Sequence, residues 1–274
     1  MTQARRKASS VLNWLMLAMV ASVLAGCAAG GTGSRITETP DRVTASDESD
    51  GAKRARVRLE LAAAYFGQGQ MTTALDEVKL AIAADPTMSA AFNLRGLIYA
   101  SLGDEALAEE SFRRALALDA RDADAMQNYG WYLCQRRRFA EAEALFDRAL
   151  AVPQYRDVQR TLASKGVCQA RNERWEQAEQ TLQQAYQLNT GNPVVAVNLS
   201  EVLYRAGKYE RARFYMRRVN DMENVADAQT LWLALRIERR LGNADAVRDL
   251  SFKLRSRFPA SRETDALNQG RFDD

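Results

Sequence analysis

The side chains that could carry out catalysis in this chain are few, because it contains no histidine. Histidine is the most frequent general acid or base and the most frequent metal ligand in proteins. The carboxylates of Glu109-Glu110, Glu141 and Glu143 are close in sequence, but they lie in helical stretches rich in Arg and Ala, as solvated helix faces do. The motifs GxSxG and HExxH and a glycine-rich phosphate loop are also absent from the sequence. We therefore predict no enzyme, no metal site and no small-molecule substrate.

The cysteine with an assignable chemistry is Cys27. It follows Leu24-Ala25-Gly26, at the end of a segment with a basic start (Arg5 to Lys7) and an apolar run from Val11 to Leu24. This arrangement resembles the signal peptide of a bacterial lipoprotein, which is cleaved before a cysteine that carries the lipid on its thiol. We predict a signal peptide over residues 1–26 and no cofactor other than the covalent lipid, such as palmitate, on Cys27.

A retained membrane-spanning helix is the alternative reading of the same segment. A span needs about 20 apolar residues, and the run reaches that length only when it is extended through small residues to Ala29. The three basic residues of the segment also account for the excess of 38 Lys and Arg over 35 Asp and Glu. The rest of the chain has no net charge, so nucleic acid is not an expected partner.

Residues 27–52 have the composition of a flexible tether. Gly, Thr, Ser, Asp and Glu predominate there, and large apolar side chains are almost absent. Such a segment cannot bury enough apolar surface to offset the loss of chain entropy.

The rest of the chain repeats with a period of about 34 residues. The repeats occupy 55–88, 89–122, 123–156, 159–192, 193–226 and 228–261, within a domain over 53–261. Position 8 of each repeat holds Ala62, Gly96, Gly130, Gly166, Ser200 or Leu235, and position 24 of repeats two to five holds Phe112, Phe146, Leu182 or Met216. This pattern is typical of tetratricopeptide repeats, antiparallel helix pairs in which a small residue lets two helices approach closely. We predict an all-α fold, a right-handed α-solenoid of six repeats, followed by a frayed polar tail over 262–274.

Cys134 and Cys168 lie at positions 12 and 10 of the first helices of the third and fourth repeats. Neighbouring first helices pack side by side about 8–10 Å apart, so facing Cα atoms come close enough for a disulfide. An exported chain would keep this bond in the oxidising periplasm. Two buried free thiols are the alternative.

Several segments of the sequence resemble the PilF/PilW family of type IV pilus biogenesis lipoproteins. They are Asn128-Tyr129-Gly130-Trp131-Tyr132-Leu133-Cys134-Gln135, Gly166-Val167-Cys168 and Leu231-Trp232-Leu233-Ala234-Leu235-Arg236-Ile237-Glu238. The resemblance implies a pilotin, a lipid-anchored protein on the periplasmic face of the outer membrane that helps the secretin PilQ reach that membrane and form multimers. Pilus biogenesis and twitching motility would depend on it. Ala28 is compatible with sorting to the outer membrane.

The partner-binding residues follow from the repeat positions that line the concave groove of such a solenoid. Ten side chains are predicted to form this groove: Asn93, Leu97, Gln127, Asn128, Trp131, Asn198, Glu201, Tyr204, Trp232 and Arg236. The asparagines would hold a peptide backbone, or alternatively cap or bridge between adjacent helices, and the aromatics would be anchors or half-buried packing. A general periplasmic adaptor for envelope enzymes or outer-membrane protein assembly is the alternative function. In either case we expect a monomeric soluble domain.

Overall fold

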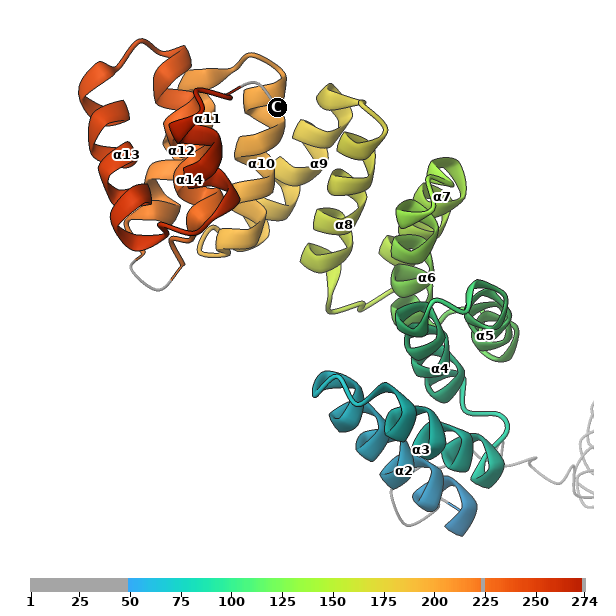
Figure 1. Cartoon of the computed structure of the whole chain (residues 1–274). Coiled ribbons are helices and arrows are strands. Elements are labelled where there is room, and N and C mark those ends of the chain that lie inside the picture. Colours follow the sequence, from blue (N-terminus) through green and yellow to red (C-terminus); the bar gives the residue numbers. More distant parts are fainter. Residues whose placement is uncertain (1–48, 223–224, 273–274) are drawn as a thin grey trace, which may run out of the picture. The chain divides into compact units, whose positions relative to one another are not determined.

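The structure, a computed structural model, describes residues 49–222 and 225–272, and within them it is all-helical (Figure 1). The first helices of successive pairs, here called A helices, are α2 (Asp50–Gly67), α4 (Ser89–Leu102), α6 (Ala123–Gln135), α8 (Val158–Arg171), α10 (Pro193–Arg205) and α12 (Ala228–Arg240). The second, here called B helices, are α3 (Met71–Ala84), α5 (Glu105–Leu118), α7 (Phe139–Leu150), α9 (Trp175–Leu188), α11 (Tyr209–Asn220) and α13 (Ala244–Arg257). Each A helix packs against its own B helix, and each of the first five also packs against the next A helix. The all-α tetratricopeptide fold is therefore confirmed.

Small residues allow the two helices of a pair to approach each other closely, as the sequence predicts. A Cβ atom added to Gly96 would lie 2.8 Å from the ring of Phe112, and one added to Gly130 would lie 2.9 Å from the ring of Phe146. In these two pairs, the aromatic ring of the B helix thus fills the space that the glycine of the A helix leaves open. Both rings are fully buried, so this contact forms the centre of each pair.

The turn between the two helices of each pair has one left-handed residue at the same repeat position. Four repeats place glycine there, with φ between 70° and 80°: Gly69, Gly103, Gly207 and Gly242. The third and fourth repeats place Arg137 (φ 60°) and Glu173 (φ 58°) at that position instead. A side chain is disfavoured in this conformation, so these two turns are held by the packing of the helices that they join.

Cys134 and Cys168 form a disulfide between α6 and α8, with their Cα atoms 5.7 Å apart. Both cysteines are buried beside Leu133, Phe146 and the other apolar side chains of the third repeat. The bond therefore joins two successive repeats within the core.

The predicted polar tail is wrong over most of its length. Residues 262–268 form a further helix, α14 (Arg262–Asn268), which packs against α12 and α13. Ser261 caps it by accepting a hydrogen bond from the backbone N–H of Thr264, and Leu267 is buried with Leu231, Leu235 and Leu254. The last pair of a solenoid has an apolar face with no following repeat, and α14 covers it.

The other end of the domain differs slightly from the predicted boundary. Helix α2 begins at Asp50, with Ser49 as its cap, so the last three residues of the predicted tether are helical. The predicted signal peptide and Cys27 lie outside the described residues. In the described part of the chain, no helix is long and apolar enough to cross a membrane.

Candidate partner-binding surface

The ten predicted groove residues all lie on A helices, but their exposure differs. Asn93, Gln127, Tyr204 and Arg236 are each at most 9% exposed. The other six are half-buried: Leu97, Asn128, Trp131, Asn198, Glu201 and Trp232. Only this second set has enough exposed surface to contact a partner.

The amide side chains in the first half of the surface bridge adjacent A helices. The Nδ2 atom of Asn128 on α6 donates a 3.1 Å hydrogen bond to Oδ1 of Asn93 on α4. On the other side of α6, Nε2 of Gln127 donates a 3.2 Å hydrogen bond to Oγ of Ser164 on α8. Asn93 and Asn128 therefore have the bridging role that was the alternative to peptide binding. Gln127 bridges two helices in the same way, although its Oε1 atom is buried without a hydrogen-bond partner.

The aromatic residues of the surface are also engaged by their neighbours. The guanidinium carbon of Arg171 on α8 lies 5.2 Å from the ring centroid of Trp131 on α6. That of Arg236 on α12 lies 4.6 Å from the ring centroid of Tyr204 on α10. Such contacts hold the rings in fixed orientations. Trp131 keeps an accessible face as a half-buried side chain, whereas Tyr204 is buried.

Two cavities flank α10, and Asn198 and Glu201 line both of them. One, of about 250 Å³, lies between α8 and α10, where Trp175 and Arg171 also line it. The other, of about 390 Å³, lies between α10 and the segment leading into α12, with Val194 and Leu233 in its wall. Asn198 donates a 2.8 Å hydrogen bond to the carbonyl of Val194, and Glu201 accepts one of 2.8 Å from Arg205. Asn198 and Glu201 are therefore accessible at the cavities around α10, and Trp232 on α12 lines a further cavity of about 320 Å³.

Comparison with known proteins identifies the family. Models of the tetratricopeptide repeat match residues 59–125, 93–157, 130–193 and 169–233. The type IV pilus assembly protein PilF of Pseudomonas aeruginosa is 25% identical over 248 residues, 89% of this chain and 93% of PilF. The structure of PilW, a widely conserved type IV pilus biogenesis factor, is 31% identical with a TM-score of 0.73 over 78% of this chain and 97% of PilW. The chain belongs to the PilF/PilW family. A PilF structure, 23% identical with a TM-score of 0.71, has the same fold.

The PilF/PilW-type surface also contains apolar side chains that the repeat positions did not predict. Val194, in the wall of the larger α10 cavity, is 65% exposed. In the first repeat, Val57 and Leu61 on α2 and Leu80 on α3 are each at least 40% exposed. The sequence shows that these side chains are large and apolar, but it does not show that they are exposed. Their exposure is known only once the helices are placed in the structure.

A repeated ion pair connects the repeats of this family member. Glu109, Glu143 and Glu179 all lie at position 21 of their repeats, and each is paired with a basic residue at position 16 of the next: Arg138, Arg174 and Lys208 respectively. Burial opposes the ionisation of Glu109, but hydrogen bonds from Arg138 and Tyr129 outweigh it and hold the pKa of this carboxyl below its usual value. Lys208 and Arg211 lower the pKa of Glu179 in the same way, against the effect of burial. Glu109 and Glu179 therefore stabilise the stacking of the repeats as ionised groups.

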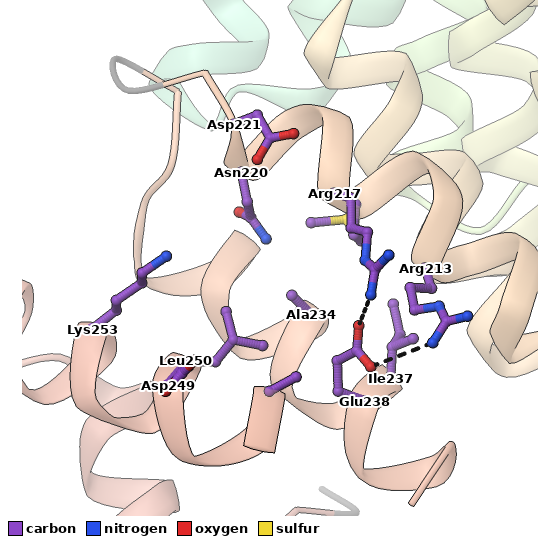
Figure 2. Close-up of a pocket in the computed structure, with 12 residues that line it drawn as sticks. Arg213, Arg217, Asn220, Asp221, Ala234, Ile237, Glu238, Asp249, Leu250 and Lys253 are labelled. Atoms are coloured by element: carbon purple, nitrogen blue, oxygen red, sulfur yellow. Dashed lines mark ion pairs between the residues drawn. The ribbon is translucent and has the colours of Figure 1, made fainter. Parts of the chain in front are cut away.

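Another pocket, of about 220 Å³, lies away from the predicted groove between α11, α12 and α13 (Figure 2). Its buried carboxylate is Glu238, 3.8 Å from a guanidinium nitrogen of Arg213 and 3.7 Å from one of Arg217. Glu238 also accepts a 3.0 Å hydrogen bond from Nδ2 of Asn243. The positive and negative side chains in the pocket wall therefore compensate one another, and their ion pairs join the fifth repeat to the sixth.

Proposed function

We propose that this chain is an outer-membrane lipoprotein of the pilotin type, which binds the type IV pilus secretin PilQ and promotes its localisation and multimerisation. Membership of the PilF/PilW family supports a role in type IV pilus biogenesis. The lipoprotein-like segment ending at Cys27 supports a lipid anchor, which would hold the repeat domain at the periplasmic face of the membrane.

The observation that carries the binding proposal is the pair of cavities on either side of α10. An extended segment of PilQ would lie across this helix, with apolar side chains against Val194 and Leu233 and polar contacts to Asn198 and Glu201. The cavities are shallow and mixed in polarity, which suits the side chains of a peptide better than an enclosed small molecule. Trp131 and Arg171 would extend this surface toward the third repeat.

The test is the amount of secretin multimer in outer-membrane fractions, measured by electrophoresis of unheated samples. Val194→Glu should remove most of the multimer, because it places a charge in the wall of the larger cavity. A glutamate in the first turn of α10 is also favourable to the helix dipole, so the fold should be unaffected. The matched control is Phe252→Glu on α13, where an equally exposed apolar side chain lines neither cavity.

Deletion of the gene tests, in the same assay, whether the protein is needed for the secretin multimer at all. Loss of the multimer, with PilQ monomer left behind or mislocalised, would support the pilotin function. An unchanged amount of multimer would contradict it and favour a general periplasmic adaptor. Crosslinking would then identify the partner of that adaptor. A normal multimer with Val194→Glu, but not with the deletion, would place PilQ on another part of the surface.

A further inference from the structure

Phe272 contacts two residues on the same face of α12. Its ring stacks on that of Trp232, with the centroids 5.4 Å apart and the planes inclined by 19°. The guanidinium carbon of Arg239 lies 4.0 Å from the centroid of the same phenylalanine. Trp232 and Arg239 are seven residues apart, which is two helical turns or about 10 Å. They form an aromatic slot, here called the Trp232–Arg239 slot, in which Phe272 lies.

Phe272 reaches this slot through the left-handed turn that ends α14. Gly270 adopts a left-handed conformation (φ 67°), and the backbone N–H of Arg271 donates a 2.9 Å hydrogen bond to the carbonyl of Ala266. Helix α14 itself is held by Leu267 in the core and by the hydroxyl of Thr264, which donates to the carbonyl of Phe258 at 2.8 Å. Phe272 can therefore leave the slot while α14 stays in place.

The slot lies beside a buried positive charge that has no carboxylate partner in the part of the chain that the structure describes. Arg236, one turn before Arg239, is 7% exposed and stacks on Tyr204. Its Nε atom is buried without a hydrogen-bond acceptor, and Arg236 makes no ion pair among the described residues. A buried guanidinium is ordinarily paired with an anion. In the sequence, two acidic residues, Asp273 and Asp274, directly follow Phe272.

We propose that the Trp232–Arg239 slot is a binding subsite for a peptide with an aromatic residue followed by acidic residues, and that the chain's own Phe272 occupies it until such a partner displaces it. The aromatic ring would lie between Trp232 and Arg239, and the acidic residues would pair with the exposed Arg239 and lie near the buried charge of Arg236. A tethered competitor lowers the apparent affinity for a partner by the fraction of molecules in which the subsite is free. The identity of the partner rests on the proposed function, whereas the slot and its occupant do not.

The test uses the chain's own segment as a probe in trans. A fluorescein-labelled peptide of residues 269–274, Gln-Gly-Arg-Phe-Asp-Asp, is titrated with the purified full chain and followed by anisotropy. Phe272→Ala should bind this peptide at least about tenfold more tightly than the unmodified chain, because its slot is empty. Phe252→Ala, which removes an exposed phenylalanine of α13 outside the slot, should behave like the unmodified chain.

Two further arms identify the chemistry that the slot recognises. Replacing the phenylalanine of the peptide by alanine, or adding Trp232→Ala to the Phe272→Ala chain, should abolish binding. Replacing its two aspartates by asparagines should weaken binding at least about threefold, and equal binding would overturn the acidic part of the proposal. Circular dichroism melts establish that each variant is folded. A folded Phe272→Ala chain that binds the peptide no better than the unmodified chain would overturn the proposal. Since no secretin is present, this result is independent of whether PilQ is the partner.

Discussion

The carboxylate of Glu109 on α5 accepts hydrogen bonds of 3.0 and 2.9 Å from Arg138, which immediately precedes α7 in the next repeat. The same pairing recurs between Glu143 and Arg174 and between Glu179 and Lys208. The repeats are therefore joined by polar contacts at equivalent positions, as well as by their apolar faces.

Acid should weaken these junctions. The pKa values of Glu109 and Glu179 are lowered in the folded state, so the unfolded chain binds protons first as the pH falls below about 4.5. Their stabilisation is complete above the unfolded-state pKa and is lost as the pH falls through the lower folded-state value. The double variant Glu109→Gln/Glu179→Gln should be less stable than the unmodified chain at pH 7 and nearer to it at pH 3. Urea denaturation at both pH values measures this, and an equal difference at the two would contradict it.

The disulfide between Cys134 and Cys168 should make a large contribution to stability. It closes a loop of 34 residues, for which the chain-entropy model gives about 3–4 kcal/mol. Cys134→Ala/Cys168→Ala should lower the free energy of unfolding by about that amount, measured by urea denaturation without reductant. A reducing agent should destabilise the unmodified chain and leave the variant unchanged. If the reducing agent destabilised both chains equally, the disulfide would not be the source of the stabilisation.

Gly130 should not tolerate even a methyl group. A Cβ atom there would lie 2.9 Å from the ring of Phe146 and 3.2 Å from the carbonyl oxygen of Ala142. Overpacking of this kind costs roughly 1–3 kcal/mol, so Gly130→Ala should lower the melting temperature. The control is Gly67→Ala at the end of α2, where no atom lies within 4 Å of the added group and helix propensity favours alanine. A melting temperature of Gly130→Ala as high as that of the control would refute the packing argument.

The left-handed turn residues offer a stabilising substitution. Glu173 is exposed and occupies the position where four other repeats have glycine. Glu173→Gly should stabilise the chain by up to about 1 kcal/mol, the net of relieved backbone strain and the added entropy of the unfolded chain. Gly207→Ala at the equivalent position should destabilise it by a similar amount. Thermal melts compare the two, and changes of the same sign would refute the explanation.

The helical architecture could be predicted because its determinants are local and periodic. Gly96 and Phe112 recur as Gly130 and Phe146 one period later, and the same period brings Cys134 and Cys168 to facing positions. Each of these residues acts within one pair or between two neighbouring pairs. A repeat position therefore specifies its contacts without knowledge of the rest of the chain.

The binding surface could be predicted less well. A repeat position specifies which face a side chain points to, but not whether a neighbour already engages it. Asn128 is bonded to Asn93, and Trp232 is stacked on Phe272, from a segment predicted to be frayed. Helix α14 is too short to be stable alone, and it forms because Leu267 packs on the last repeat and because Ser261 and Thr264 make hydrogen bonds at its start.

The small helix α14 also limits the length of the array. In a solenoid, each repeat has an apolar face that the following repeat covers. On the last pair, α12 and α13, this face is covered by α14 instead. A seventh repeat, or the first repeat of a second molecule, could pack on this face only by displacing α14. A chain shortened before Ser261 would have an uncovered apolar end, and such molecules would be expected to join end to end as open filaments rather than remain single arrays.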